Sequence, residues 1–188
     1  MNITERIKGI LFRPQEEWHT IAGETTPIAE LYKNYIILLA AIGPVAAFIG
    51  MSLVGVSLPV GGRYRMPITT GILHAVVQYV LTLVSVYVLA FIIDALAPTF
   101  SGEKNIDQAF KLATYSYTPG WLVGIFVLIP GFAILGILGL YGLYLLYVGI
   151  PVLMKSPGEK SIGYTVAIII AAIILFVLIG AISRVFIS

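Results

Sequence analysis

The most polar pair inside a long apolar stretch of this chain is His74 with Gln78. The two residues are four positions apart, so they share one face of a helix, and Thr82 and Ser85 continue that face. An ionisable side chain within a membrane helix is a functional-site hypothesis by default. Two interpretations stay open: an internal hydrogen-bonded pair, which we favour, and a path for a substrate or a proton.

Residues that bind metals are scarce. Histidine occurs only at His19 and His74, in different segments, and there is no cysteine. A zinc site usually has three or four protein ligands. The absence of cysteine also excludes disulfides, iron–sulfur clusters and a thiol nucleophile. We therefore expect neither a metal site nor a cofactor.

The carboxylates that could do acid–base chemistry have simpler structural explanations. Glu16 and Glu17 lie where a short helix begins, and its dipole favours negative charge there. Asp94 ends an apolar segment, where we expect an ion pair with a lysine; the candidate partners are Lys104, Lys111 and Lys155. No Ser/His/Asp arrangement, phosphate-binding glycine loop or HExxH motif is present. We predict no catalytic residue and do not expect an enzyme.

The composition places these residues in a membrane protein. The chain is 59% hydrophobic and 11% charged, with a mean hydropathy of +1.00, whereas a globular domain is about 45–50% apolar and about 25% charged. A net charge of +2 gives no argument for nucleic-acid binding.

Five apolar segments are long enough to span a bilayer, since ~20 residues at ~1.5 Å each cross a ~30 Å core. Pro44 is expected to kink the first, and the turn dipeptide Pro130-Gly131 makes the fourth return antiparallel to the third. The predicted fold class is all-α: a polytopic membrane helix bundle of five transmembrane helices, in one domain over residues 34–188. The spans cover about residues 35–58, 68–96, 112–129, 132–154 and 162–182.

Residues 1–33 are predicted to form short N-terminal amphipathic helices. Ile3, Ile7 and Ile10 share one face of the first, with Arg6 elsewhere. The second begins at Pro14, since proline suits the first helical position, and Trp18 gives it an apolar side. Such helices can lie in the headgroup plane or pack on the protein's own membrane helices, which we favour.

The lysines and arginines predict the orientation, because cytoplasmic loops carry the excess of positive charge. With five spans and a cytoplasmic N-terminus, eight of the eleven lie inside: Arg6, Lys8, Arg13, Lys33, Lys104, Lys111, Lys155 and Lys160. Arg63, Arg65 and Arg184 lie outside. The N-terminus shows no signal-peptide pattern. We expect the inner or plasma membrane, with the C-terminus outside.

Small residues recur in the fourth predicted span. Gly136, Gly139 and Gly142 are spaced by three, although glycine costs roughly 1 kcal/mol in a helix in water. We interpret them as a seam for close helix packing. Tyr144 and Tyr147 flank the seam, and interfacial anchoring or helix packing explains them more simply than a ligand surface.

Three stretches together resemble the Yip family of Ypt/Rab-interacting membrane proteins, specifically its short prokaryotic branch. They are FRPQEEWHTIAGE, AFKLATYSYTPGWL followed by IPG, and LYGLYLLYVGIPVLMKSP, which fits the pattern LYxxYxGxPxLMxxP most specifically. The matching residues are Pro14, Trp18, Tyr115, Pro119, Pro130, Gly131, Tyr144, Tyr147, Gly149, Pro151 and Pro157.

The resemblance implies a five-span protein with a cytoplasmic N-terminus and supplies no catalytic residue. Eukaryotic members bind Rab GTPases, but this chain lacks their long N-terminal region and its acidic-Leu-Tyr-Gly-Pro motif, so we expect no Rab binding. We predict a non-enzymatic scaffold or membrane-organising protein, with lipids and either further copies of the chain or other membrane proteins as partners. The alternative is a small-solute or ion transporter or channel subunit with a polar path near His74 and Gln78.

Overall fold

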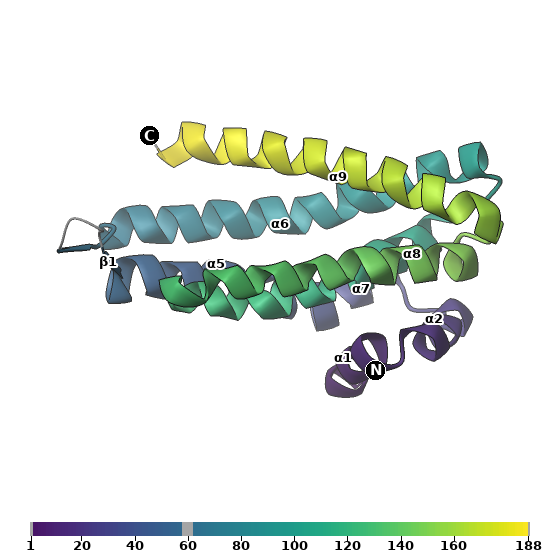
Figure 1. The fold of residues 1–188 in the computed structure, drawn as a ribbon, viewed down its shortest axis with the longest axis horizontal. Helices are drawn as coiled ribbons and strands as arrows, with labels where there is room; N and C mark the ends of the chain where they lie inside the picture. Colours follow the sequence, from purple (N-terminus) through teal and green to yellow (C-terminus); the bar gives the residue numbers. More distant parts are fainter. Residues whose placement is uncertain (1, 58–61, 188) are drawn as a thin grey trace.

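The protein is an elongated bundle of helices in the computed structural model, which describes residues 2–57 and 62–187 (Figure 1). The predicted all-α class is confirmed. The N-terminal pair, α1 (Ile3–Phe12) and α2 (Pro14–Gly23), is separate from the long helices. Asn2 caps α1 by accepting a hydrogen bond from the Thr4 amide, and α2 begins at Pro14.

The first long run consists of short pieces that follow one another. They are α3 (Ile28–Leu31), η1 (Tyr32–Ile36), α4 (Ile37–Ala40), α5 (Ile42–Phe48) and η2 (Ile49–Val54). The α geometry breaks at Ala41, just before Pro44, because proline lacks an amide proton and its ring clashes with the carbonyl four residues earlier. The run ends before Gly55, whose φ of 83° lies in the left-handed region. A two-stranded ribbon, β1 (Val56–Ser57) and β2 (Arg63–Tyr64), follows.

The remaining helices are α6 (Ile68–Leu96), η3 (Ala97–Phe100), α7 (Ile106–Val123), η4 (Gly124–Leu128), η5 (Pro130–Leu140), α8 (Tyr141–Leu153) and α9 (Gly158–Ile187). The two longest, α6 and α9, run most of the length of the bundle. The predicted span over 132–154 is not one continuous α-helix in the structure. Its first part belongs to η5, a 3₁₀ helix like η4 before it, and α geometry resumes at Tyr141. Since a 3₁₀ helix rises ~2.0 Å per residue, η5 covers about 22 Å.

Helix α7 lies at the centre of the bundle. It packs against α6, α8, α5 and η5. Twelve of its eighteen residues are buried, from Ala109 to Val123. The buried set includes polar side chains such as Thr114 and Thr118, which are fully enclosed. Protein, more than lipid, therefore surrounds this helix.

Four helical runs within the described residues are long and apolar enough to cross a membrane: Ile28–Val54, Ile68–Phe100, Ile134–Leu153 and Gly158–Leu175. Large apolar side chains on them point outward, as at Phe91 (62% exposed) and Ile134 (75%). The protein is a multi-pass membrane protein. The third predicted span, 112–129, is not among the four, because α7 carries polar residues along its buried faces. The count of five spans stays a prediction.

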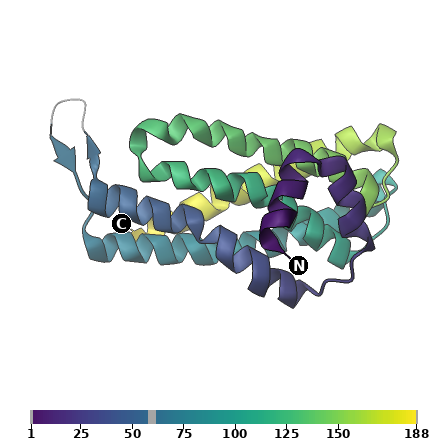
Figure 2. The ribbon, with the colours of Figure 1, turned by 90° about the horizontal axis from the view of Figure 1, so that it is seen from below.

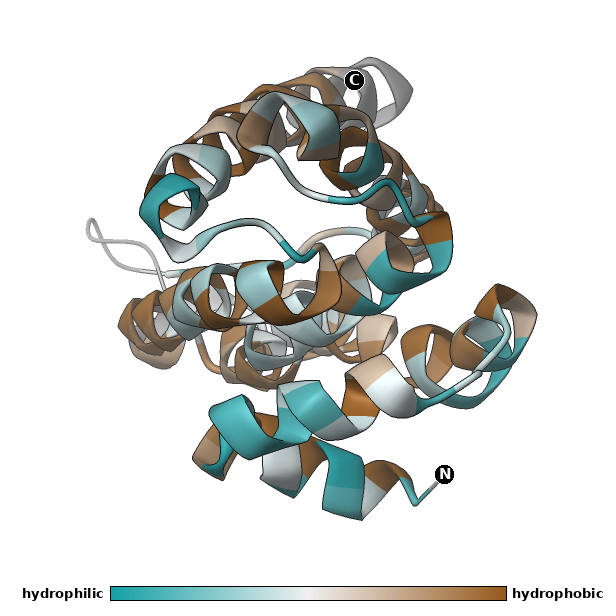
Figure 3. Cartoon of the chain, turned by 90° about the vertical axis from the view of Figure 1, so that its right-hand side faces the viewer, coloured by the Kyte–Doolittle hydropathy of each residue, from teal (hydrophilic) through white to brown (hydrophobic). Residues whose placement is uncertain are grey.

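The connections at one end of the bundle are tied together. Lys155 pairs with Glu103 at 2.7 Å, and the Ser156 hydroxyl donates to the Phe100 carbonyl at 2.8 Å. Figure 3 looks onto this end and shows hydrophilic residues in the connections and in the N-terminal helices. The C-terminal helix ends at the opposite end of the bundle (Figure 1). The loop residues 58–61 lie outside the described residues.

Candidate functional site: a docked N-terminal helix pair

The N-terminal helix pair, α1 with α2, lies along the side of the bundle formed by α7 and α8 (Figure 2). Ile10, Trp18 and Ile21 are fully buried in this contact. Burying an apolar side chain of this size contributes about 1.5–3 kcal/mol. The pair is therefore packed on the hydrophobic core of the bundle.

Trp18 is the anchor of the contact. Its ring meets Tyr115 edge-on, with centroids 6.3 Å apart. A Cβ atom at Gly149 would lie 2.8 Å from Trp18 Cε2 and 2.6 Å from Leu112 Cδ1. Glycine at position 149 thus makes room for the indole on α8. The predicted family residues Trp18, Tyr115 and Gly149 meet at one point.

Arg6 is the charged centre of the N-terminal pair. Its guanidinium donates to Glu17 and to Glu24 and lies over the Tyr115 ring, with Cζ 5.5 Å from the centroid. The side chain is only 6% exposed. Burial lowers the pKa of Arg6, but Tyr115 and the two carboxylates outweigh it and hold the pKa above its usual value. Arg6 is charged at any physiological pH and holds α1 to α2.

Lys111 attaches the pair to α7. Its ammonium donates to the carbonyl of Ile21 at 3.1 Å and to the carbonyl of Glu24. The side chain is 2% exposed. Burial lowers the pKa of Lys111, and the nearby carboxylates of Glu24 and Asp107 only partly oppose this. The lysine satisfies carbonyl groups at the end of α2 that lack a partner within the helix.

Two neutral hydrogen bonds complete the contact. Gln108 Nε2 donates to the Ala22 carbonyl at 3.0 Å. The Tyr141 hydroxyl donates to the Leu11 carbonyl at 2.9 Å. The C-terminal ends of both short helices are therefore bonded to side chains of the bundle.

Sequence reasoning missed this polar network. It placed Arg6 away from the apolar face of α1, whereas the buried residues of α1 are Arg6, Gly9 and Ile10. The spacing of Arg6 and Ile10 was a usable signal, because residues four apart lie on one helix face. Lys111 gave the second signal, since it is a charge beside an apolar span.

The outer side of the pair is polar except at its corner. Glu5, Lys8, Arg13 and Glu16 are exposed, and Phe12 at the corner is 79% exposed. Phe12 borders an apolar groove of about 530 Å³ whose lining includes Leu122, Phe126 and Pro119, the proline within α7. The corner thus presents an aromatic side chain beside an apolar surface.

The remaining family residues shape the two C-terminal helices. Tyr144 and Tyr147 point outward from α8, 43% and 41% exposed. Pro130 and Gly131 begin η5, and Pro151 lies inside α8. The Pro157 carbonyl accepts the Lys160 amide at 2.9 Å and so begins α9.

The three glycines of the predicted seam have different surroundings. A Cβ atom at Gly142 would lie 2.3 Å from the Ser116 carbonyl oxygen, and one at Gly139 would lie 3.4 Å from Gly120 Cα. Nothing lies within 4 Å of that position at Gly136. The seam stays a prediction, which close contact with α7 supports at Gly139 and Gly142 but not at Gly136.

The intramembrane polar residues lie apart from the N-terminal pair, on α6. Gln78 lines a cavity of about 250 Å³ with Thr82, Ser85 and Tyr117, whereas His74 is not among its lining residues. His74 Nδ1 and Asp94 Oδ1 are buried without a hydrogen-bond partner among the described residues. Two of the lysines expected to pair with Asp94 have other partners in the structure. Lys155 pairs with Glu103, and Lys111 donates to a carbonyl of α2.

The site is built for holding the N-terminal pair in place. Its charges are paired with one another or with backbone carbonyls. Over residues 2–57 and 62–187, no group of three or more histidine or carboxylate side chains is placed to hold a metal ion. Arg6 Nε, Trp18 Nε1 and Gln108 Oε1 are buried without a hydrogen-bond partner among the described residues, so the charges of this contact are paired but its polar atoms are only partly satisfied.

Residues 8–179 match the Yip1 domain. The chain belongs to this family. The prediction of a Yip-type membrane protein is therefore confirmed. The Yip1 match includes the second half of α1, all of α2 and the bundle as far as residue 179 in α9.

The Yip1 chain is also similar to an Escherichia coli protein named inner membrane protein YohC, from strain K12 and from strain CFT073. Each is 29% identical over 122 residues, which is 65% of this chain and 63% of the relative. The match thus spans less than two thirds of the relative's length. No solved structure matches this Yip1 chain.

Proposed function

We propose that this Yip1 protein is a non-enzymatic, multi-pass scaffold or membrane-organising protein that acts through its docked N-terminal helix pair. The observation that carries the proposal is the buried polar contact of the pair, in which Arg6 joins α1 to α2 and Lys111 joins the end of α2 to α7. The outer face of a fixed pair keeps one geometry, as a binding platform requires. Its exposed charges and Phe12 are available to a partner or to the lipid headgroups.

The tyrosines of the bundle support a structural role. Tyr32 donates to the Leu83 carbonyl at 2.8 Å, and Tyr79 to the Ile37 carbonyl at 2.9 Å. Tyr35 and Thr118 share a hydrogen bond of 2.8 Å. These bonds join neighbouring helices and pair off hydroxyl groups in the interior. Thr82 and Ser85 bond to carbonyls of their own helix.

We further propose five crossings, with the N-terminus cytoplasmic in the inner or plasma membrane. The run α7–η4 has 18 α residues and 5 residues of 3₁₀ helix, about 37 Å by their rises. That length exceeds the ~30 Å hydrocarbon core. The test replaces Ser188 by cysteine, which is then the one cysteine of the sequence. Labelling by an impermeant reagent from outside is expected; labelling only after permeabilisation contradicts the orientation.

The scaffold proposal is tested by crosslinking in native membranes followed by purification of the tagged protein. The wild type is expected to recover either itself or a defined membrane protein. Arg6→Ala is expected to lose that species, because α1 separates from α2 and the outer face of the pair loses its fixed geometry. Arg13→Ala, whose side chain is 71% exposed, is the matched control and should retain it. Loss in both variants or in neither contradicts a role for the docked pair.

A transporter or channel subunit is the second candidate, favoured by the cavity at Gln78. Discontinuous helices that expose backbone near the membrane centre are a feature of some transporters, and the first run and the η4–η5 turn are discontinuous. This candidate requires polar groups that reach a water-filled path. The test is the flux of an ion or small solute into liposomes that contain the protein. Flux that His74→Ala abolishes would establish the transporter in place of the scaffold.

A further inference from the structure

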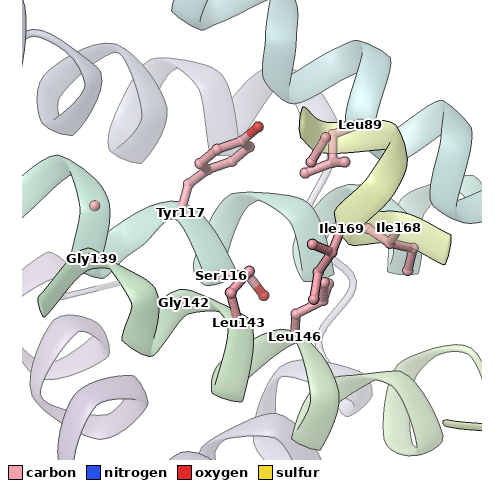
Figure 4. Close-up of a pocket in the computed structure, with 11 residues that line it drawn as sticks. Leu89, Ser116, Tyr117, Gly139, Gly142, Leu143, Leu146, Ile168 and Ile169 are labelled. Atoms are coloured by element: carbon pink, nitrogen blue, oxygen red, sulfur yellow. The ribbon is translucent and has the colours of Figure 1, made fainter. Parts of the chain in front are cut away.

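A cavity of about 140 Å³ lies inside the bundle, between α7, the η5–α8 run and α9 (Figure 4). Leu146, Ile168 and Leu89 form much of its wall, and nearly all of the wall is apolar. An apolar cavity of about 150 Å³ stays dry and binds benzene. A hydrocarbon segment is therefore the kind of occupant that fits.

The side chain of Ser116 contributes a polar group to this wall. Ser116 is 9% exposed, and its Oγ has no hydrogen-bond partner among the described residues. Figure 4 shows this oxygen on the side of α7 that faces Leu146 and Ile169. An unpaired buried hydroxyl costs about 1–3 kcal/mol. The hydroxyl can donate to an acceptor carried by an occupant.

Glycines create the space. Gly120 and Gly139 line the cavity from α7 and η5. Nothing lies within 4 Å of the position of a Cβ atom at Gly120. A larger side chain at position 120 would therefore enter the open volume without meeting backbone.

The cavity adjoins the one at Gln78. The two share Tyr117, Gly120 and Ala172, and the second has a volume of about 250 Å³. Gln78 adds an amide to the second cavity, which is therefore the more polar of the two.

The cavity borders the lipid-facing surface. Leu143, in its wall on α8, is 39% exposed, and Tyr144 beside it is 43% exposed. Aromatic belts mark the membrane–water interface. Gly142, which meets the Ser116 carbonyl, precedes Tyr144 and Tyr147 by two and five residues, or about 3–8 Å along α8. The Ser116 hydroxyl thus lies near the depth of lipid ester groups.

We propose that this cavity binds one acyl chain of a membrane phospholipid, which enters from the lipid-facing surface beside Leu143. The chain fills the apolar space that Gly120 and Gly139 leave, and the Ser116 hydroxyl donates a hydrogen bond to its ester carbonyl. The inference needs the bundle to lie in a bilayer and does not depend on the scaffold proposal.

The test uses full-length protein in phosphatidylethanolamine–phosphatidylglycerol vesicles containing a phospholipid with a diazirine on its acyl chain. After irradiation, mass spectrometry should find the label on cavity residues such as Gly120, Leu146 and Ile168. Gly120→Leu fills the space and should reduce this labelling at least fivefold. Gly136→Leu is the matched control: its Cβ position is also open, but it does not line the cavity, so labelling should not change.

Ser116→Ala tests the hydroxyl separately. It should weaken retention of phospholipid during detergent purification several-fold, measured by native mass spectrometry, without lowering the melting temperature. Equal cavity labelling in Gly120→Leu and Gly136→Leu would overturn the site. Labelling of the cavity by a diazirine fatty acid but not by the phospholipid would also overturn it. Undiminished retention in Ser116→Ala would overturn the hydrogen bond.

Discussion

Replacing Arg6 by alanine removes the cation that two carboxylates share. Glu17 and Glu24 would keep their negative charges, 19% and 31% exposed, with no guanidinium between them. The contact of Arg6 with the Tyr115 ring would also be lost. Helix α1 should then separate from α2 and from Tyr115 far more often, while the long helices stay folded.

The size of the effect follows from burial. Breaking a buried ion pair by removing one partner costs about 3–5 kcal/mol. Here the arginine is 6% exposed but both carboxylates keep some contact with water, so we expect the contact of α1 with α2 to lose about 2–4 kcal/mol. At about 1.4 kcal/mol per factor of ten, this makes the state with α1 separated about 30- to 700-fold more populated.

Hydrogen–deuterium exchange in nanodiscs measures that population directly. Amides of α1 should exchange faster by this factor in Arg6→Ala, and amides of α6 should not change. Arg13→Ala is the matched control, because Arg13 is 71% exposed and lies 3.8 Å from Glu16; an exposed pair is worth ~0–1 kcal/mol. Equal exchange of α1 in the two variants would refute the assignment of the α1–α2 contact to Arg6.

Three further predictions concern the same contacts. Trp18→Ala should weaken docking by about 3–5 kcal/mol, as large-to-small core changes do, measured by hydrogen exchange of the α2 amides. Gly142→Ala should lower the melting temperature, because its Cβ would lie 2.3 Å from the Ser116 carbonyl oxygen and overpacking costs about 1–3 kcal/mol; Gly136→Ala, with open space, should not. The pKa of Lys111 is lowered in the docked state, so the undocked state binds more protons at a pH below ~10.4, the ordinary pKa of lysine. Docking should therefore strengthen as the pH rises toward ~10.4. Lys111→Met should remove this pH dependence, and a docking free energy that still changes with pH in Lys111→Met would contradict the reasoning.

The membrane class and most helices could be predicted from the sequence, since both follow from local patterns. Helix α6 has the predicted bounds, Ile68–Leu96, because an apolar run with a proline before it and another soon after fixes both ends. Helix α2 begins at Pro14 for a similarly local reason. The family could be predicted from short motifs at Trp18 and around Gly149.

What could not be predicted depends on contacts between distant residues. Residues 112–129 are predicted to be a membrane span, but hydropathy along one segment does not reveal that other helices enclose the polar residues of α7. Arg6 and Lys111 are separated by more than 100 positions in the sequence, yet both hold α2. The 3₁₀ geometry of η5 likewise gave no signal in a sequence rich in apolar residues and glycine.

The central functional claim is that the bundle supports a docked platform and does not conduct. The most direct measurement is flux of ions and small solutes into liposomes that contain the purified full-length protein. We expect the same flux as in protein-free liposomes, for the wild type and for His74→Ala. Flux above that background which His74→Ala abolishes would contradict the claim and establish a transport path along α6.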